Sequence, residues 1–457
     1  MLLRALCCVL WPLVISASTP AADSPNVVVI LADDLGSGDL SCYGSPENET
    51  PRLDKLTKSG AKFENFYAAC AVCSPSRASL LTGRTPIRAG IYSWIHVSHK
   101  MHLRTEETTL AELLKAAGYR TCHVGKWHLG YNLEDGTGGP TPADHGFDHW
   151  MATGNNAVPS HHNPRNFVRD GKVLGKQEGY SCQLVVDEAI AWLDQTHDST
   201  EPFYLNVWFH EPHQPVAAPE ELSSRHSDTD LPDYYGSIEN MDSAVGRLLD
   251  HLDSLGITDD TLIVFTSDNG SYRNDRRNNG DVRGVKGTLW EGGIRAPGLF
   301  SWPGHIEPGT IIEQPAGIVD ILPTVCAAAG ISAPSDRTLD GVNLLPALYG
   351  ESLNRSHPLY WFYARSRPVC VIRDGDFCLI ADPEIDLSRE NLFDEAMIGD
   401  IKRTGLVNFR MFNLKEDPRQ EWDLAEEDPQ RLEMMKRAMI SLHRDVVEEG
   451  FDWRTAE

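Results

Sequence analysis

Long apolar runs are scarce in this sequence of 457 residues. The N-terminus has the longest one, from Ala5 to Ile15, which follows Arg4 and precedes a set of small residues. The run is shorter than the ~20 residues that a membrane-spanning helix needs. Its three-part pattern is typical of a secretory signal peptide, which we place over residues 1–22. We therefore predict an exported protein with no transmembrane anchor, periplasmic or secreted, or lysosomal in a eukaryotic source.

The sequence also has fewer cationic than acidic residues. The sequence has 41 lysines and arginines against 66 aspartates and glutamates, which gives a formal net charge of −25. Proteins that bind nucleic acids need clustered lysine and arginine to face the phosphates, so this charge balance argues against that class. It does not argue against a small anionic substrate, provided that one pocket of the protein is locally basic.

The cysteines lack the paired spacing of a zinc ribbon. Two of the ten, Cys7 and Cys8, leave with the signal peptide, and only Cys70 and Cys73 form a Cys-x-x-Cys pair. With no second such pair, a structural zinc site is disfavoured, and the local context does not match a thioredoxin-type redox pair. Disulfide connectivity stays open. None of these interpretations explains the residues Ser74-Pro75-Ser76-Arg77 that follow Cys73.

Strand-like and helix-like segments alternate through most of the chain. Short apolar segments at 26–31, 119–124, 204–209 and 261–265 predict strands, and periodic segments at 110–118 and 234–255 predict helices. This alternation predicts an α/β fold whose large, mostly parallel central sheet is flanked by helices. We assign residues 23–355 to this domain.

The pattern changes near residue 356. The segments PLYWFYA, VCVIRDG and FCLIAD predict short antiparallel strands, and residues 430–448 predict a terminal helix. We assign residues 356–457 to a smaller C-terminal α+β subdomain with a small antiparallel sheet and a terminal helix.

Acidic side chains follow two of the predicted parallel strands. Asp33 and Asp34 come directly after the first strand, and Asp268 and Asn269 follow the fourth. Polar groups at the carboxyl ends of parallel strands meet at one edge of the sheet. Each pair alone is also compatible with a turn or a helix cap. Adjacent carboxylates repel unless a cation neutralises them, so together the four residues predict an all-oxygen divalent site that favours calcium over zinc.

Cationic and imidazole side chains follow the other two strands. Lys126 and His128 come after the second strand, where alternation places both on one face of an extended segment. His210 and His213 follow the third strand, and Lys286 lies in a glycine-rich segment. Taken singly, each of these residues could equally be an exposed or packed side chain with no catalytic role.

Five segments, in this order along the chain, resemble the sulfatase family of the alkaline-phosphatase-like superfamily: NVVVILADDLG, CSPSRASLLTGR, GYRTCHVGKWHLG, TSDNG and KGTLWEGGIRAP. The resemblance runs from about residue 26 to residue 424. The segments TPIRAGIYSW and PSDRTLDGVNLLPALYG are similar to the branch that contains arylsulfatase A and N-acetylgalactosamine-6-sulfatase.

This resemblance implies that a maturation enzyme converts Cys73 to 3-oxoalanine (Cα-formylglycine). It implies one Ca²⁺ ion held by Asp33, Asp34, Asp268 and Asn269, which the modified Cys73 also reaches. The catalytic residues that it implies, besides Cys73, are Arg77 at the hydrated aldehyde, Lys126 and Lys286 at the sulfate oxygens, His128 at a hydrate hydroxyl, and His213 (or His210) at the leaving group. Candidate substrate contacts are Asn155, Asn156, His161 and His162.

The implied chemistry is the hydrolysis of a sulfate ester. One hydroxyl of the aldehyde hydrate attacks sulfur and expels the alcohol, and the second then loses its proton so that sulfate leaves and the aldehyde re-forms. The implied substrate is a sulfated carbohydrate, such as a 6-sulfated hexosamine or galactose, or an aryl sulfate. Two alternatives stay open: a phosphodiesterase or phosphonate monoester hydrolase on the same scaffold, and an inactive calcium-dependent glycan-binding protein. The sequence does not determine the oligomeric state.

Overall fold

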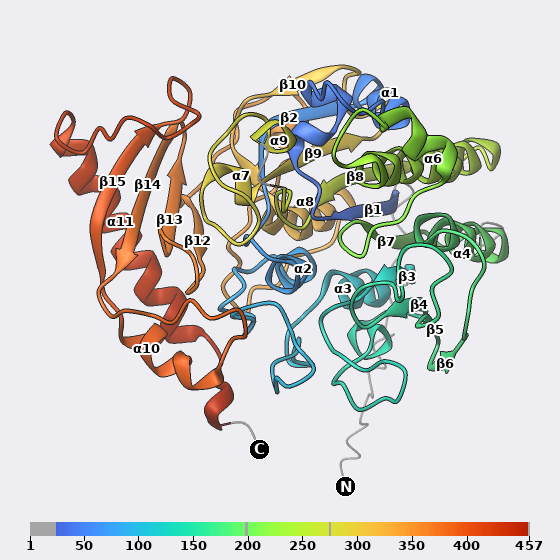
Figure 1. The fold of residues 1–457 in the computed structure, drawn as a ribbon, viewed down its shortest axis with the longest axis horizontal. Helices are drawn as coiled ribbons and strands as arrows, with labels where there is room; N and C mark the ends of the chain where they lie inside the picture. The colour runs from blue at the N-terminus through green and yellow to red at the C-terminus, as the bar shows by residue number, and fades with distance from the viewer. Residues whose placement is uncertain (1–23, 197–199, 274–275, 456–457) are drawn as a thin grey trace, which may run out of the picture.

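The computed structural model describes residues 24–196, 200–273 and 276–455 (Figure 1). The predicted signal peptide, including Cys7 and Cys8, lies outside the described residues. Within the described part of the chain, none of the helices combines the length and the apolar character needed to cross a membrane.

One large mixed sheet forms the centre of the molecule. Its five middle strands, β8, β1, β7, β3 and β4, all run parallel, and β9 runs antiparallel to both β8 and β2. In spatial order the strands are β10 (Thr310–Ile312), β2 (Ala61–Tyr67), β9 (Arg295–Ser301), β8 (Thr261–Ser267), β1 (Asn26–Asp33), β7 (Phe203–Pro212), β3 (Arg120–Lys126), β4 (His149–Thr153), β5 (Val168–Arg169) and β6 (Lys172–Val173), with β11 (Ala316–Gly317) beside β2. The predicted α/β architecture with a mostly parallel sheet is confirmed.

Helices cover both faces of this sheet (Figure 1). The α-helices of the described residues are α1 (Pro51–Ser59), α2 (Cys73–Thr82), α3 (Leu110–Ala116), α4 (Ser181–Thr196), α5 (Glu220–Ser223), α6 (Pro232–Ser254), α7 (Glu291–Ile294), α8 (Ile321–Ala328), α9 (Leu345–Leu348), α10 (Ile398–Arg403) and α11 (Pro429–Glu449). Strand β1 alternates between the two faces: Val28 and Ile30 join the core on the α4 and α6 side, and Val29 and Leu31 join the core on the opposite side. Burial on both faces explains the unbroken β-branched run that the sequence shows there.

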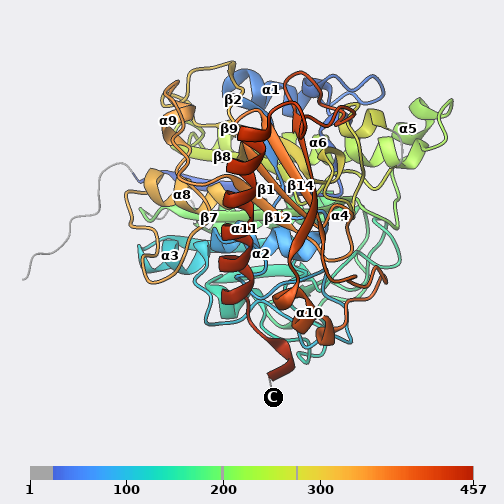
Figure 2. The same ribbon diagram turned by 90° about the vertical axis from the view of Figure 1, so that its left-hand side faces the viewer.

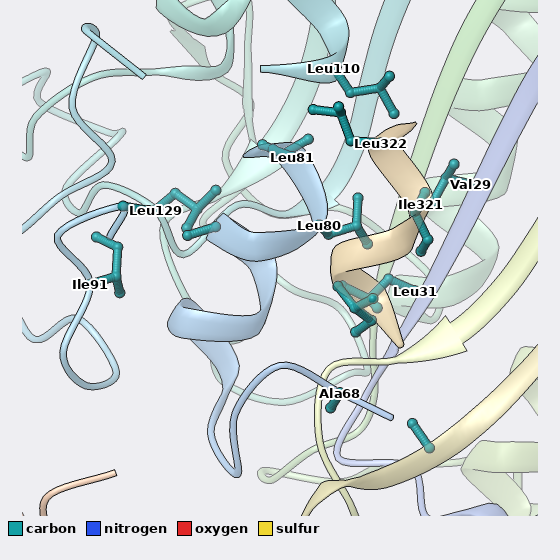
Figure 3. Close-up of a cluster of buried hydrophobic side chains, with 14 of the residues drawn as sticks. Val29, Leu31, Ala68, Leu80, Leu81, Ile91, Leu110, Leu129, Ile321 and Leu322 are labelled. Atoms are coloured by element: carbon teal, nitrogen blue, oxygen red, sulfur yellow. The ribbon is translucent and has the colours of Figure 1, made fainter. Parts of the chain in front are cut away.

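Helix α2 lies inside the core, not at the surface. Figure 3 shows Leu80 and Leu81 of α2 near Ile321 and Leu322 of α8 and near Leu31 of β1. All ten residues of α2 are buried. Close packing on every side holds the first residue of this helix, Cys73, in a fixed position relative to the end of β1.

A second, smaller sheet stands beside the first (Figure 1). It is antiparallel throughout, with the strand order β12 (Leu359–Phe362), β13 (Cys370–Asp374), β14 (Phe377–Pro383) and β15 (Leu406–Asn413). Figure 2 shows the long helix α11 crossing this sheet. The three strands and the terminal helix that the sequence predicts are all present, whereas β15 is not among the predicted strands.

Ion pairs from two buried arginines attach α11 to the rest of the molecule. The buried guanidinium of Arg88 contacts Asp340 at 3.1 Å and also pairs with Asp445 and Glu449 of α11. Arg84, at the end of the signature-like segment, bonds to Glu107 at 2.6 Å and to Glu449. The C-terminal helix is thereby fixed against the segment that follows α2.

Candidate active site

The acidic residues meet at the ends of two neighbouring strands. Strands β1 and β8 pair in parallel with Ala32 opposite Ser267, so the residues that follow them lie side by side. The backbone N–H of Asp34 donates to Asp268 Oδ1 at 3.2 Å, and Asn269 Nδ2 donates to Asp34 Oδ1 at 2.8 Å. Asp34 has a φ of 65°, in the left-handed region, which turns the chain sharply at the end of β1.

The donor set fits a hard divalent cation. Asp33, Asp34 and Asp268 supply carboxylate oxygens, and all three are buried. The side-chain oxygen of Asn269 is buried and has no hydrogen-bond partner among the residues that the structure describes. A buried acceptor without a donor is costly, and an oxygen-liganded cation such as Ca²⁺ would satisfy it. Ligand atoms of Asp33, Asp34, Cys73 and His213 also lie within 4.8 Å of one another.

Cys73 lies beside this acidic cluster. It is the first residue of α2, and its Sγ is 3.6 Å from Asp33 Oδ1 and 3.5 Å from Lys286 Nζ. Burial raises the pKa of the Cys73 thiol to about 12, although Lys126 and Lys286 act in the opposite direction. A thiol with this pKa is protonated at neutral pH, and a protonated thiol is a poor nucleophile.

Cys70 has a different environment. Its backbone N–H donates to Ser76 Oγ at 2.9 Å, and Ser76 Oγ donates to the Cys70 carbonyl at 3.2 Å. All eight cysteines in the described residues are free thiols, so Cys70 and Cys73 are not joined in a disulfide. Cys70 helps to shape the turn that leads into α2, and only Cys73 faces the acidic cluster.

Arg77, one helical turn after Cys73, neutralises part of the acidic cluster. Its Nε and Nη2 donate to Asp268 Oδ2 at 2.9 and 2.7 Å, and its Nη1 donates to the Lys126 carbonyl at 2.9 Å. The guanidinium also lies 5.2 Å from the ring centre of Trp208. These contacts satisfy a fully buried cation on three sides.

The pKa values of Asp33 and Asp268 are shifted in opposite directions. Burial opposes ionisation of Asp33, but the nearby cations, with Lys126 the strongest, hold its pKa well below the usual range. Burial, together with the charge on Asp33, raises the pKa of Asp268 to about 7 even though Arg77 acts against it. A divalent cation would stabilise both carboxylates in the ionised form.

Two lysines approach the cluster from different segments. Lys126, the last residue of β3, donates from Nζ to Asp33 Oδ2 at 2.6 Å and to Asn156 Oδ1 at 3.1 Å. Lys286 lies 2.6 Å from Asp34 Oδ1, and the charge of Asp34 raises the pKa of Lys286 despite burial. The Lys286 ammonium group therefore stays charged at neutral pH.

The histidines are arranged differently from one another. His128 has a φ of 53° beyond the end of β3, so it reaches the site by a turn and not by the extended alternation that the sequence predicts. Its Nε2 is 3.0 Å from the Ile95 carbonyl. His213 Nε2 is 3.6 Å from Asp34 Oδ2, whereas His210 bonds to Thr153 Oγ1 at 2.8 Å in the interior. Burial lowers the pKa of His213 to about 4, so its imidazole is neutral at pH 7.

A cavity of about 450 Å³ opens above this centre. Of the predicted residues, Cys73, His128, His213, Lys286, Asn155 and Asn156 line it. His161 and His162 do not: His161 is buried 3.8 Å from Glu211, and His162 stacks on Tyr180 with ring centres 4.8 Å apart. The structure adds five residues that the sequence reasoning did not assign to the site: Val72, Trp94, Gly287, Arg365 and Asn391.

The fold and the residues of the site together indicate the class of protein. A mostly parallel α/β sheet that collects carboxylates, lysines and one buried reactive position at its strand ends is typical of the alkaline-phosphatase-like hydrolases. Residues 25–331 match the model of the sulfatase family. The chain belongs to this family and is therefore a sulfuric ester hydrolase, which confirms the resemblance seen in the sequence.

Individual relatives agree with this assignment. The chain is 36% identical over 386 residues to N-acetylgalactosamine-6-sulfatase of Mus musculus, which covers 78% of this chain and 72% of the relative. It is 34% identical over 470 residues to arylsulfatase A of Bos taurus, with 94% and 90% covered. Among solved structures, Ps i-CgsB in complex with k-i-k-neocarrahexaose matches with a TM-score of 0.80 at 26% identity, covering 94% of each chain.

Proposed function

We propose that this protein removes a sulfate ester from a sulfated carbohydrate, with a 6-sulfated hexosamine or galactose as the preferred substrate type. The observation that carries the proposal is the lining of the cavity, in which Lys286, two histidines and two asparagines surround Cys73. The relatives support a sugar substrate, because one is an N-acetylgalactosamine-6-sulfatase and another was crystallised with a carrahexaose.

We propose further that Asp33, Asp34, Asp268 and Asn269 hold one Ca²⁺ ion. The unpartnered buried oxygen of Asn269 and the three carboxylates support this assignment. When bound, the ion would offset negative charge on the sulfate oxygens. Because Lys126, Lys286 and Arg77 already pair with these carboxylates, the bound ion would free the lysine ammonium groups to bind sulfate.

Cys73 is the proposed site of conversion to formylglycine by a maturation enzyme, in keeping with export of the chain. The position of Cys73 between Asp33 and Lys286 supports this proposal, and burial raises the pKa of its thiol, which makes the unmodified side chain a poor nucleophile. The modified residue would supply a hydroxyl in place of sulfur as the attacking group.

The surrounding side chains have complementary proposed tasks. Lys126 and Lys286 bind the sulfate oxygens, and Arg77 keeps the charge of Asp268 compensated next to the reacting centre. His128 orients the hydroxyl of the modified Cys73, because its Nε2 is fixed by the Ile95 carbonyl and its Nδ1 has no partner within the described residues. The neutral imidazole of His213 lies at the cavity surface, beside the position that a leaving alcohol would occupy.

Two measurements test the proposed function. The intact mass of the peptide that contains Cys73 should show that oxygen has replaced sulfur with oxidation to the aldehyde. The matured protein should release inorganic sulfate from N-acetylgalactosamine 6-sulfate and from 4-nitrophenyl sulfate, and faster than it cleaves bis(4-nitrophenyl) phosphate. A preference for the phosphodiester would favour a phosphodiesterase instead, and binding of the sugar without turnover by the matured protein would favour a glycan-binding protein.

A further inference from the structure

The C-terminal part of the chain forms one wall of the cavity. Arg365, between β12 and β13, and Asn391, between β14 and α10, both line it, and Trp94 lines it from the segment after α2. Among the lining residues are two permanent cations, Lys286 and Arg365, and no carboxylate. In a chain with a net charge of −25, the lining of this cavity is therefore locally basic.

Arg365 differs from the other arginine of the site in its partners. Arg77 is neutralised by Asp268 at 2.7 Å. Arg365 donates from Nε to the Arg389 carbonyl at 3.4 Å and from Nη1 to the Tyr363 hydroxyl at 3.2 Å, and both acceptors are neutral. No carboxylate of the described residues lies within 4.0 Å of its guanidinium.

The nearby Arg367, unlike Arg365, does have a carboxylate partner. Arg367 bonds to the Ala364 and Ser366 carbonyls at 2.8 and 2.7 Å and contacts Asp386 at 3.3 Å. Arg367 thus holds the loop together, whereas the two bonds of Arg365 hold its side chain in place and leave Nη2 without an acceptor in the described residues. A positioned guanidinium with unused donors in a pocket is suited to a carboxylate or sulfate group.

The reacting sulfate group does not need Arg365, because other cations already lie beside Cys73. Lys126, Lys286 and Arg77 already contact Cys73 or the carboxylates beside it, and all three precede residue 356. Arg365 comes from the C-terminal part of the chain, between β12 and β13. A cavity of about 450 Å³ falls within the range of about 300–1,000 Å³ that is usual for small-ligand sites, so one sulfated sugar could contact both walls.

We propose that Arg365 binds a second anionic group of the substrate, so that the preferred substrate carries two anions close together. The second anion is either another sulfate on the same sugar or the carboxylate of a neighbouring uronic acid. This inference rests on the proposed function, since it assumes that the first anion is the sulfate bound near Cys73.

The test compares wild-type protein with Arg365→Gln on four substrates. Two carry one anion, 4-nitrophenyl sulfate and N-acetylgalactosamine 6-sulfate. The others carry a second anion: N-acetylgalactosamine 4,6-disulfate has a second sulfate, and a uronic acid–N-acetylgalactosamine 6-sulfate disaccharide has a carboxylate. We expect wild-type kcat/KM to be about 10- to 100-fold higher on at least one of the dianionic substrates than on N-acetylgalactosamine 6-sulfate, the gain expected from one charge-assisted pair. The substrate that shows the gain identifies the source of the second anion.

The Arg365→Gln substitution should remove that preference, and Arg365→Lys should keep part of it because the charge remains. Arg389→Gln is the matched control: it removes the same charge from an exposed side chain outside the cavity lining, and it should leave the preference intact. The proposal is overturned if wild-type protein does not prefer either dianionic substrate, or if Arg365→Gln lowers kcat/KM equally on all four.

A binding measurement keeps this inference separate from the proposed function. Calorimetric titration of Cys73→Ala protein with the same sugars needs neither maturation nor turnover. Arg365→Gln in that background should weaken binding of the preferred dianionic sugar about tenfold more than binding of N-acetylgalactosamine 6-sulfate. If no substrate releases sulfate but this difference in affinity persists, the proposed reaction fails and the second anion site stands. Equal weakening of both sugars overturns the site.

Discussion

Arg77 and Asp268 connect the two halves of the proposed centre. Two nitrogens of the Arg77 guanidinium bond to the same oxygen of Asp268, at 2.9 and 2.7 Å, and both side chains are completely buried. Arg77 comes from helix α2 and Asp268 follows strand β8, so this pair fixes the position of Cys73 relative to the proposed metal ligands.

Replacing Arg77 by Met should therefore destabilise the fold. The substitution leaves Asp268 buried next to Asp33 without its main counter-charge, and removing one partner of such a pair costs about 3–5 kcal/mol. Urea unfolding in the presence of EDTA measures this change. Arg52→Met, which breaks an exposed pair with Asp250, is the control and should cost about 0–1 kcal/mol. Equal losses in the two variants would contradict the structural role given to Arg77.

The two cysteines of the Cys-x-x-Cys pair should respond differently to substitution. Cys73→Ala should abolish sulfate release, because the proposed attacking group is built on that side chain. Cys70→Ala should keep most of the activity, since the hydrogen bonds of Cys70 to Ser76 involve only its backbone. Sulfate release from 4-nitrophenyl sulfate and the thermal midpoint of each variant are the measurements. Retained turnover in Cys73→Ala protein would refute the nucleophile assignment.

Calcium should stabilise the protein through Asn269. We expect the thermal midpoint to fall when EDTA is added and to recover with Ca²⁺, because a ligand at 100 times its Kd stabilises the native state by about 2.7 kcal/mol. Asn269→Ala should shift the calcium titration to higher concentrations. Asn155→Ala alters a cavity amide that is not a proposed ligand, and its calcium titration should match that of the wild type. A midpoint insensitive to both EDTA and Ca²⁺ would exclude the proposed ion site.

His443 should make stability depend on pH in the mildly acidic range. This residue of α11 is buried, its Nδ1 lies 2.9 Å from the Tyr360 hydroxyl, and burial lowers its pKa to about 4. In the unfolded chain the pKa is about 6.5, so below that pH the unfolded state binds a proton that the native state excludes. The contribution of His443 is complete above about pH 6.5 and is lost as the pH falls toward 4, by up to about 3 kcal/mol.

The measurement is the free energy of unfolding in urea at several pH values between 7.5 and 4.5. His443→Gln cannot take up this proton, so its curve should be flatter than that of the wild type over this range. Parallel curves for the two proteins would show that His443 does not titrate as its burial implies.

Several strands and helices could be predicted from the sequence because their patterns involve only neighbouring residues. The β-branched run of β1 and the apolar periodicity of α6 depend only on neighbouring residues, and both elements lie where the sequence predicts them. Strand β15 was missed because only three of its residues are aromatic or β-branched and charge and amide groups interrupt it. Its pairing with β14 is a long-range contact that local patterns do not contain.

The sequence by itself determined the chemical types at the site and their order along the chain. Acids, lysines and histidines directly follow predicted parallel strands, and topology requires such strand ends to meet. Only the tertiary structure decided which of them face the cavity. It separates His213 from His210 and excludes His161 and His162, because each orientation depends on the turn after its strand and on packing against distant segments. Trp94, Arg365 and Asn391 reach the site solely through the packing of the C-terminal subdomain and a long loop, which no local pattern encodes.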